Sequence, residues 1–441
     1  MLYSLCDNRF KLWKKTKILI DQDVVKAEQN CDGYKEEGDF FHIAIAPVLL
    51  ITQFFGVFPL SSVMQNFPEK LVNKPPSITR FISGIVIFGG FSISILSVSK
   101  LGANGLNIIN VAEPIFFGIS TTGTVLFWKL ATQWKSLIMM WSETELTFLK
   151  KPLRDKILRR KIRSVATRLL LLGLVEHILS VMNNVSNLKK EIVDCNYNIT
   201  DPVKYYSLKT FSTVFHAIPY NIPTAIYNEY VVLSMTLAWN FVDLFIMLVS
   251  IGLSTRFTQL NCRILGGIEA REPTSERFWE QIRLHYVSLC ELTEVVNSAV
   301  SRLVFISYAN DVYFICLQIM NASQELPLLI NKVYFSFSFL FLLMRSFLMF
   351  WFSSQVQEAS HEPCKLILRV PNEEYGEELQ RVQMYAKRGV SLNGMGVFLV
   401  SRRILLTIAS TIATYELVIL AYRRKSYDQS NRTSCDSLQL F

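Results

Sequence analysis

The chain has 441 residues, of which 51% are hydrophobic, 12% aromatic and only 18% charged. Soluble domains carry about 25% charged residues, so this composition indicates a membrane protein built as one bundle rather than several soluble domains. The net charge of +9 would suggest nucleic acid in a soluble protein. Here much of the positive charge falls in one loop beside an apolar run, so nucleic acid is excluded as a partner.

The chain begins with a charged segment, residues 1–40, which shows no signal-peptide pattern and is expected to form a cytosolic amino-terminal tail. Residues 41–60 are apolar but contain Pro47, Gly56 and Pro59. Their apolar part is only about 17 residues long, which is at the lower limit for a membrane crossing. We predict an interfacial or re-entrant helix here, and whether it crosses the membrane stays open.

Seven further apolar runs are long enough to cross about 30 Å of hydrocarbon as helices. They predict an all-α membrane protein with seven transmembrane helices. Six of them make up a bundle over residues 81–353, and the seventh follows a polar region at 354–395. The runs lie at 81–99, 111–131, 166–186, 231–254, 301–321, 331–353 and 396–421.

The charges of the loops predict the direction of each helix. Residues 129–163 contain ten Lys or Arg, a pattern that keeps a short loop in the cytosol. Alternating from this loop, the amino terminus is cytosolic and the tail 423–441 is extracellular. The slightly acidic loops 255–300 and 354–395, and the basic residues directly after the last helix, give weaker signals in the opposite sense.

Sequons of the form Asn-x-Ser/Thr test this orientation, because they are glycosylated only on the lumenal side. The four sequons, at Asn184, Asn198, Asn321 and Asn431, all fall in segments that the charge pattern places outside. Asn198 is the best candidate for glycosylation, since Asn184 and Asn321 lie at a membrane edge. The inside amino terminus also argues against a seven-helix G-protein-coupled receptor.

Five short motifs follow one another along the chain. They are Phe41-His42 with Ala46-Pro47-Val48-Leu49, Lys129-Leu130-Ala131-Thr132-Gln133-Trp134, Leu174-Val175-Glu176-His177, Asn310-Asp311-Val312-Tyr313-Phe314-Ile315-Cys316 and Thr414-Tyr415-Glu416-Leu417. In this order and spacing they resemble the insect gustatory receptors, and among these the sugar-receptor group, over residues 41–422. The last motif opens the family signature, which ends in Gln-Phe where this chain has Ala421-Tyr422, so ion selectivity does not carry over.

The resemblance implies a sugar-gated, non-selective cation channel, a gustatory receptor for sweet taste in the plasma membrane of chemosensory neurons. Four identical or related subunits would surround one pore, which each subunit lines with its seventh helix, 396–422. Residues 81–353 would bind a mono- or disaccharide, and 354–395 would form a cytosolic anchor between subunits. The alternatives are a secondary transporter for a small polar solute and, less favoured, a G-protein-coupled receptor.

The last apolar run carries small, weakly polar residues at the helical spacing of three, four and seven. Such a stripe suits a water-filled pore, although the same residues also pack membrane helices against one another. With the family signature, the predicted pore residues are Thr407, Ser410, Thr411, Thr414, Leu417, Ala421 and Tyr422.

Polar residues deep inside other spans predict a ligand site, because ionisable groups in hydrocarbon are costly unless they are paired or face an aqueous cavity. Trp239 and Asp243 lie at i and i+4 on one helical face, so that a sugar could stack on the ring and donate hydroxyls to the carboxylate. The alternative is that Asp243 or Asp311 pairs with Arg345 as a structural bridge. The predicted ligand residues are Glu176, His177, Trp239, Asn240, Asp243, Asn310, Asp311, Tyr313 and Gln318.

Other features predict no enzyme, cofactor or metal site: the five His are scattered and no phosphate loop or nucleophile motif has its required context. Helical spacing continues through 255–300 and 353–393, for example at Phe278, Ile282 and Tyr286. We therefore expect cytosolic extensions of the membrane helices that pack the subunits together.

Overall fold

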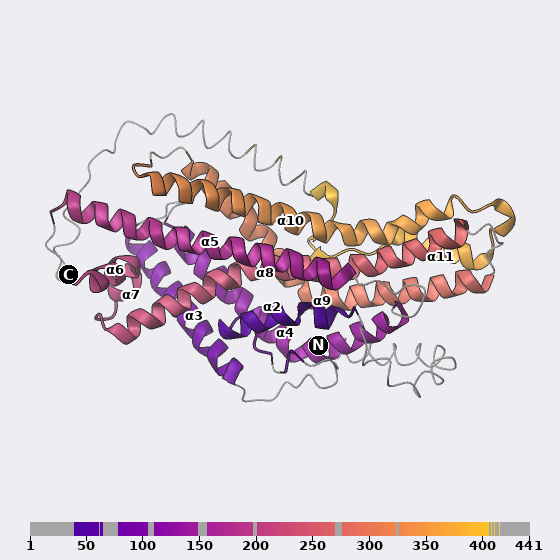
Figure 1. Ribbon diagram of the computed structural model, residues 1–441, viewed down its shortest axis with the longest axis horizontal. Coiled ribbons are helices and arrows are strands. Elements are labelled where there is room, and N and C mark those ends of the chain that lie inside the picture. Colours follow the sequence, from indigo (N-terminus) through magenta and orange to yellow (C-terminus); the bar gives the residue numbers. More distant parts are fainter. Residues whose placement is uncertain are drawn as a thin grey trace.

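A computed structural model describes residues 39–60, 62–64, 78–104, 110–148, 157–196, 201–269, 276–322, 326–404, 407, 410 and 414. These residues form an elongated helical bundle in which α5, α8 and α10 follow the long axis (Figure 1). The elements are α2 (Phe41–Phe54), α3 (Ile78–Asn104), α4 (Ala112–Phe148), α5 (Ile157–Asp194), α6 (Pro202–Thr210), α7 (Ser212–Phe215), α8 (Ile222–Glu269), α9 (Glu276–Asn321), α10 (Leu329–Ile367), the 3-10 helix η3 (Asn372–Glu374), α11 (Glu377–Arg388), β1 (Asn393–Gly394) and β2 (Phe398–Leu399).

Six helices of the described part, α3, α4, α5, α8, α9 and α10, are long and apolar enough to cross a membrane. They correspond to the first six predicted spans. Most of the predicted seventh helix, like residues 1–38 and the tail 423–441, lies outside the described residues. Its start differs from the prediction, because Met395 and Gly396 adopt φ values of 54° and 76° in the turn between β1 and β2. Helical residues therefore begin at Arg402 rather than at 396.

The helices extend well beyond the membrane. With 48 residues, α8 measures about 72 Å, more than twice the thickness of a hydrocarbon core. The extensions are helical as predicted, since α8 continues to Glu269, α9 starts at Glu276 and α10 ends at Ile367. Their cytosolic side and their role between subunits stay predictions. By contrast, the expected loop 129–163 is mostly helix, because α4 runs on to Phe148.

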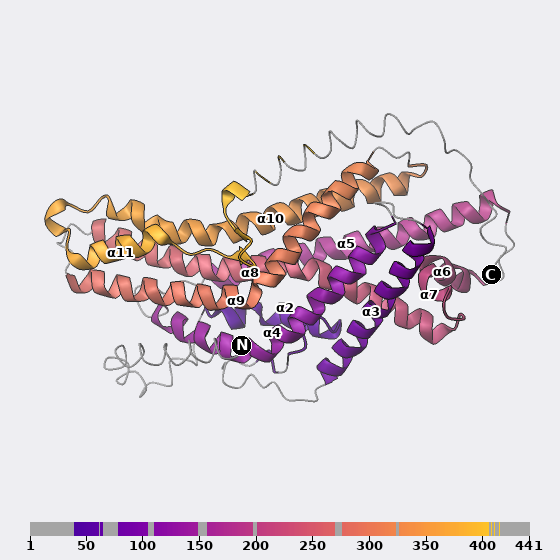
Figure 2. The ribbon, with the colours of Figure 1, turned by 180° about the vertical axis from the view of Figure 1, so that it is seen from behind.

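The centre of the bundle is α8, which packs against α3, α4, α5, α9 and α10. Every residue from Phe241 to Phe257 is buried, as expected for a helix that is apolar on all sides and has neighbours all round. Close packing depends on Gly252, where an added Cβ atom would lie 2.7 Å from the ring of Trp141 and 2.8 Å from that of Phe41. Figure 2 shows α3 and α4 side by side on one side of this core.

The short helix predicted near 41–60 is α2, which holds Pro47 within it and packs against α3, α4, α5 and α8. Its 14 residues rise about 21 Å, less than the hydrocarbon thickness. Phe41 is completely buried and stacks on Trp141 with ring centroids 4.0 Å apart. The helix is therefore shorter than a crossing requires, and its interfacial or re-entrant placement stays a prediction.

The two ends of the bundle differ (Figure 1). At one end α6 and α7 fold within the expected outer loop 187–230. At the other end α11 packs against α9 and α10 and completes a separate apolar cluster around Trp279, Tyr286 and Leu379. The sequons Asn184 and Asn321 lie on α5 and at the end of α9, whereas Asn198 and Asn431 are outside the described residues.

Candidate functional site

Three membrane helices meet at a buried arginine. Arg345 of α10 places Nε 2.7 Å from Oδ2 of Asp243 on α8, and Nη2 3.6 Å from Oδ1 of Asp311 on α9. Their exposed fractions are 2%, 1% and 0%. Two of the predicted ligand residues thus converge on one guanidinium. Both aspartates lie as the alternative prediction of a bridge to Arg345 requires.

The same guanidinium contacts two more predicted residues on α8. Nη1 of Arg345 donates a hydrogen bond to Oδ1 of Asn240, and Cζ lies 4.6 Å from the ring centroid of Trp239. The Trp239 ring is flanked by Phe116, whose ring is perpendicular at 5.5 Å, and by Phe314 at 5.1 Å. Trp239, Asn240 and Asp243 therefore present a stacking surface and acceptors to one guanidinium, and the spacing of Trp239 and Asp243 at i and i+4 predicts their part of this arrangement.

The polar groups of this cluster are incompletely hydrogen-bonded. Asp243 accepts a hydrogen bond from Ser307 on α9, but neither oxygen of Asp311 accepts one of good geometry. The buried Oδ1 of Asn310 and Nε1 of Trp239 are also without a hydrogen-bond partner. Buried polar groups are normally hydrogen-bonded, so several donors and acceptors without a partner in one place mark a candidate binding site.

Glu176 lies near this cluster, across the interface of α5 with α10. It is buried and accepts a hydrogen bond of 3.0 Å from Ser338 of α10. A Cβ atom added at Gly173, three residues earlier, would lie 3.9 Å from Nδ2 of Asn240, so α5 approaches the cluster closely at this level. His177, the next residue, is half-buried.

The two remaining predicted ligand residues lie further along α9. Tyr313 packs edge-on against Phe314, with ring centroids 5.0 Å apart, in the apolar cluster that also includes Trp239. Gln318 is half-buried and lies two turns beyond Asp311 toward the end of the helix. Tyr313 thus joins the periphery of the site, whereas Gln318 is displaced from its centre.

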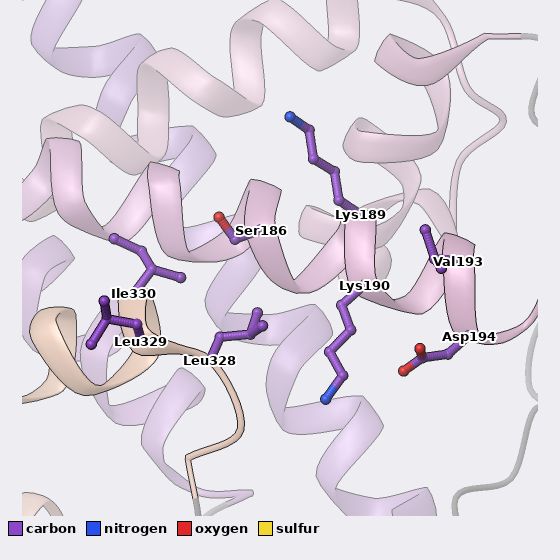
Figure 3. A pocket seen from close by; sticks show the side chains of 8 residues that line it. All are labelled: Ser186, Lys189, Lys190, Val193, Asp194, Leu328, Leu329 and Ile330. Atoms are coloured by element: carbon purple, nitrogen blue, oxygen red, sulfur yellow. The ribbon is translucent and has the colours of Figure 1, made fainter.

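Two pockets lie elsewhere. One, of about 480 Å³, lies where the last turns of α5 meet the start of α10, and Figure 3 shows Lys189 and Lys190 pointing to opposite sides of α5 there. The other, of about 470 Å³, lies between α8 and α10 near Asn261 and Arg402. None of the predicted ligand residues lines either pocket.

A second buried charge cluster was not predicted. Arg256 of α8 and Glu145 of α4 are both completely buried, with Nη2 2.7 Å from Oε1. The arginine also donates to Oε1 of Gln259 and to the backbone oxygen of Asp39, while Glu145 accepts from the backbone N–H of Phe41. The carboxylate of Asp39 in turn accepts from the backbone N–H groups of the first turn of α5. The signal available in the sequence was Arg256 itself, a charged residue close to the end of the apolar run 231–254.

The start of the last helix is attached to α10. Arg402 forms an ion pair with Glu358, and its Cζ lies 4.9 Å from the ring centroid of Trp351. Of the predicted pore residues, Thr407, Ser410 and Thr414 are described; they are exposed and bond to preceding backbone oxygens in the helical manner. Thr411, Leu417, Ala421 and Tyr422 lie outside the described residues.

The described helices and their buried polar cluster define a multi-pass helical membrane protein. The profile of the trehalose receptor family matches residues 20–435, and the chain belongs to this family. It is 32% identical over 396 residues to the gustatory receptor for sugar taste 61a of Drosophila melanogaster, covering 89% of this chain and 90% of that one. It is 31% identical to the gustatory receptor 5a for trehalose of the same species, covering 88% and 87%.

The fold is also similar to a solved structure. The insect olfactory receptor OR5 from Machilis hrabei, in complex with eugenol, has a TM-score of 0.60 and 14% sequence identity, covering 86% of this chain and 97% of that one. At this identity the likeness concerns the fold. The predicted membership of the sugar group of insect gustatory receptors is confirmed, and so is the prediction of a receptor rather than an enzyme.

Proposed function

We propose that this protein is a subunit of a sugar-gated, non-selective cation channel that serves sweet taste. The observation that carries the proposal is the buried cluster on α8, α9 and α10, in which an aromatic face, two carboxylates and an amide meet. Membership of a family of sugar gustatory receptors supports sugar as the ligand class and favours a receptor over a transporter.

Sugar chemistry fits the cluster. A pyranose offers an apolar C–H face that stacks on an aromatic ring, here Trp239, and hydroxyls that donate to charged or amide acceptors such as Asp243, Asp311 and Asn240. An analogue that lacks a hydroxyl would leave one of these buried acceptors unpaired, which is a strong basis for discrimination. In this proposal Glu176, His177, Asn310, Tyr313 and Gln318 complete the surroundings of the mono- or disaccharide.

The channel would be a homo- or heterotetramer of related subunits in the plasma membrane of chemosensory neurons. Each subunit would line the pore with residues 396–422 and join its neighbours through residues 354–395, with the amino terminus in the cytosol and the carboxyl terminus outside. The compact packing of α11 on α9 and α10 supports an anchor, and the contact of Arg402 with α10 supports a link to the pore. Asn198 would be glycosylated.

Whole-cell and single-channel recording tests the proposal. Cells that express the chain, alone and with a related sugar-receptor subunit, are exposed to a panel of mono- and disaccharides. We expect a saturable, sugar-dependent cation current with unitary openings. Sugar uptake without unitary openings would identify a transporter instead, and an epitope after Phe441 that stains only in permeabilised cells would contradict the orientation.

A further inference from the structure

The guanidinium of Arg345 occupies the place that the proposed function gives to the sugar. Its Cζ lies 4.6 Å from the ring centroid of Trp239, which is the distance of a stacked pair. The same group is paired with Asp243 and Asp311 and bonded to Asn240. One side chain therefore covers the stacking surface and engages the three acceptors that a saccharide would need.

A guanidinium and a pyranose make similar demands on such a site. Arginine offers a flat face and five N–H donors in a fixed arrangement, and a sugar offers a flattened C–H face surrounded by hydroxyl donors. Both cannot lie on one ring, because stacked groups approach to within about 4 Å of each other. Phe116 and Phe314 also pack against Trp239, with ring centroids 5.5 and 5.1 Å away, so a ligand that stacks on this ring would have to compete for the position that Arg345 takes.

We propose that Arg345 is an internal occupant of the sugar site and that sugar binds in competition with this side chain. The inference rests on the proposed function. It adds one step, the displacement of Arg345, which limits the sensitivity of the receptor to sugar. Arg345 is held for such a role by contacts that are numerous but imperfect. Its Nη2 lies 3.6 Å from Asp311, and neither this nitrogen nor Nε makes a hydrogen bond of good geometry.

Displacement of Arg345 would also reach the start of the last helix. Arg345 belongs to α10, and the same helix carries Trp351 and Glu358, which hold Arg402. When the guanidinium leaves the Trp239 ring, α10 loses its contacts with α8 at this level. The same helix contacts Arg402, so the change reaches the start of the last helix. Helix α10 thereby links competition at the sugar site to the contact of Arg402 at the start of the last helix.

Competition makes a directional prediction. When a site is free for only a fraction of the time, the apparent dissociation constant of its ligand is larger by the inverse of that fraction. Weakening the occupant should therefore increase sugar sensitivity, whereas a purely structural bridge would leave sensitivity unchanged or reduce it. Arg345→Lys is the appropriate change, because an ammonium keeps the charge but loses the flat face and the fixed fork of donors.

The test is a sugar dose–response measured as current and as binding to purified receptor, with surface level recorded by biotinylation. For Arg345→Lys we expect the half-maximal concentration, compared at equal surface level, to fall by about tenfold. Arg381→Lys, the same change at an exposed pair on α11, is the matched control and should leave the half-maximal concentration unchanged.

A second variant covers the case in which Arg345→Lys is retained in the cell. The double change Arg345→Gln with Asp311→Asn removes the guanidinium together with one of the two carboxyl groups that it faces, and leaves Asp243 with its hydrogen bond from Ser307. It should also lower the half-maximal concentration. An unchanged or higher value in the variants that reach the surface would overturn the competition, as would retention of both variants. A wild-type receptor without any sugar response would instead overturn the proposed function.

Discussion

Two buried arginines on neighbouring helices differ in how completely they are paired. Arg256 faces one carboxylate, that of Glu145, and its Nε, Nη1 and Nη2 all donate hydrogen bonds. Arg345 faces two carboxylates, and two of its nitrogens form ion pairs without hydrogen bonds of good geometry. Both side chains are within 2% of complete burial.

The difference separates a fully hydrogen-bonded charge cluster from the cluster that we propose as the sugar site. Arg256 faces one carboxylate, and each nitrogen of its guanidinium donates a hydrogen bond. The cluster therefore fixes α2 and the first turn of α5 against α4 and α8. Around Arg345 two carboxyl groups share one guanidinium, and several polar atoms have no hydrogen-bond partner. Burial alone therefore does not mark a candidate binding site, whereas several donors and acceptors without partners beside an aromatic ring favour one.

The largest expected effect comes from breaking the Arg256 cluster. Arg256→Ala leaves Glu145 charged, completely buried and unpaired, a situation that costs about 3–5 kcal/mol of folding free energy. We expect a marked fall in the thermal midpoint of detergent-solubilised protein, measured by fluorescence-detected size exclusion, and little protein at the cell surface.

A double variant distinguishes lost pairing from lost volume. Arg256→Met with Glu145→Leu removes both charges and keeps apolar bulk, so stability should recover for the most part. An Arg256→Ala protein with the wild-type midpoint would show that the cluster does not hold the helices together.

The next effect tests the packing of α2 on the same region. Gly252→Ala introduces a Cβ atom that lies 2.7 Å from Trp141 and 2.8 Å from Phe41, both buried, so we expect a loss of about 1–3 kcal/mol. The matched control is Gly118→Ala on α4, where no atom lies within 4 Å of the new methyl group. The control should be neutral or slightly stabilising, because Ala favours helices over Gly. Equal midpoints for the two variants would contradict the close contact.

The sequence predicted the membrane helices better than their ends. Long apolar runs predict crossings because the bilayer demands about 20 such residues, and six of the runs correspond to described helices. The basic segment 129–163 appeared to be a loop because charged residues suggest solvent. Glu145 within it is buried because Arg256, 111 residues away, provides its counter-charge, and such a partner cannot be predicted from local composition.

The site shows the same limit. Helical spacing placed Trp239 and Asp243 together, since positions on one helix have fixed relative directions. The meeting of α8, α9 and α10 at Arg345 depends on packing, so the sequence could offer a bridge only as an alternative. Gln318 shows the same limit, because a polar residue on the same helix as Asp311 lies two turns away from the cluster, a distance that the list of polar residues did not reveal.

A smaller effect is expected from removing the aromatic ring of the Arg345 cluster. Trp239→Ala removes the stacking surface, and loss of about 1.4 kcal/mol of sugar affinity would raise the half-maximal sugar concentration about tenfold. Trp239→Phe keeps a ring and should give a smaller shift. Surface levels should stay near wild type, and an unchanged dose–response for Trp239→Ala would remove this ring from the site.

The smallest effect concerns an ion pair at the anchor end, outside the membrane-spanning part. Oε2 of Glu378 on α11 lies 2.5 Å from Nε of Arg283 on α9, and Oε1 lies 2.6 Å from Arg381. The hydrogen bond from Arg283 and the charges of both arginines lower the pKa of Glu378 below its ordinary value. A carboxyl with a lowered folded-state pKa stabilises the protein above its unfolded pKa of about 4.3, and this stability is lost as pH falls through the folded pKa.

Glu378→Gln should therefore lower the thermal midpoint slightly at pH 7, by the equivalent of less than about 1 kcal/mol, as is usual for a pair near the surface. The difference from wild type should shrink as pH falls below about 4, since the wild-type carboxyl is then protonated as well. Glu377→Gln is the matched control, because its side chain is 80% exposed and lies 3.5 Å from Arg381. A Glu378→Gln deficit that stays constant from pH 7 to the acidic limit would show that this contact works through packing rather than charge, unlike the cluster at Arg256.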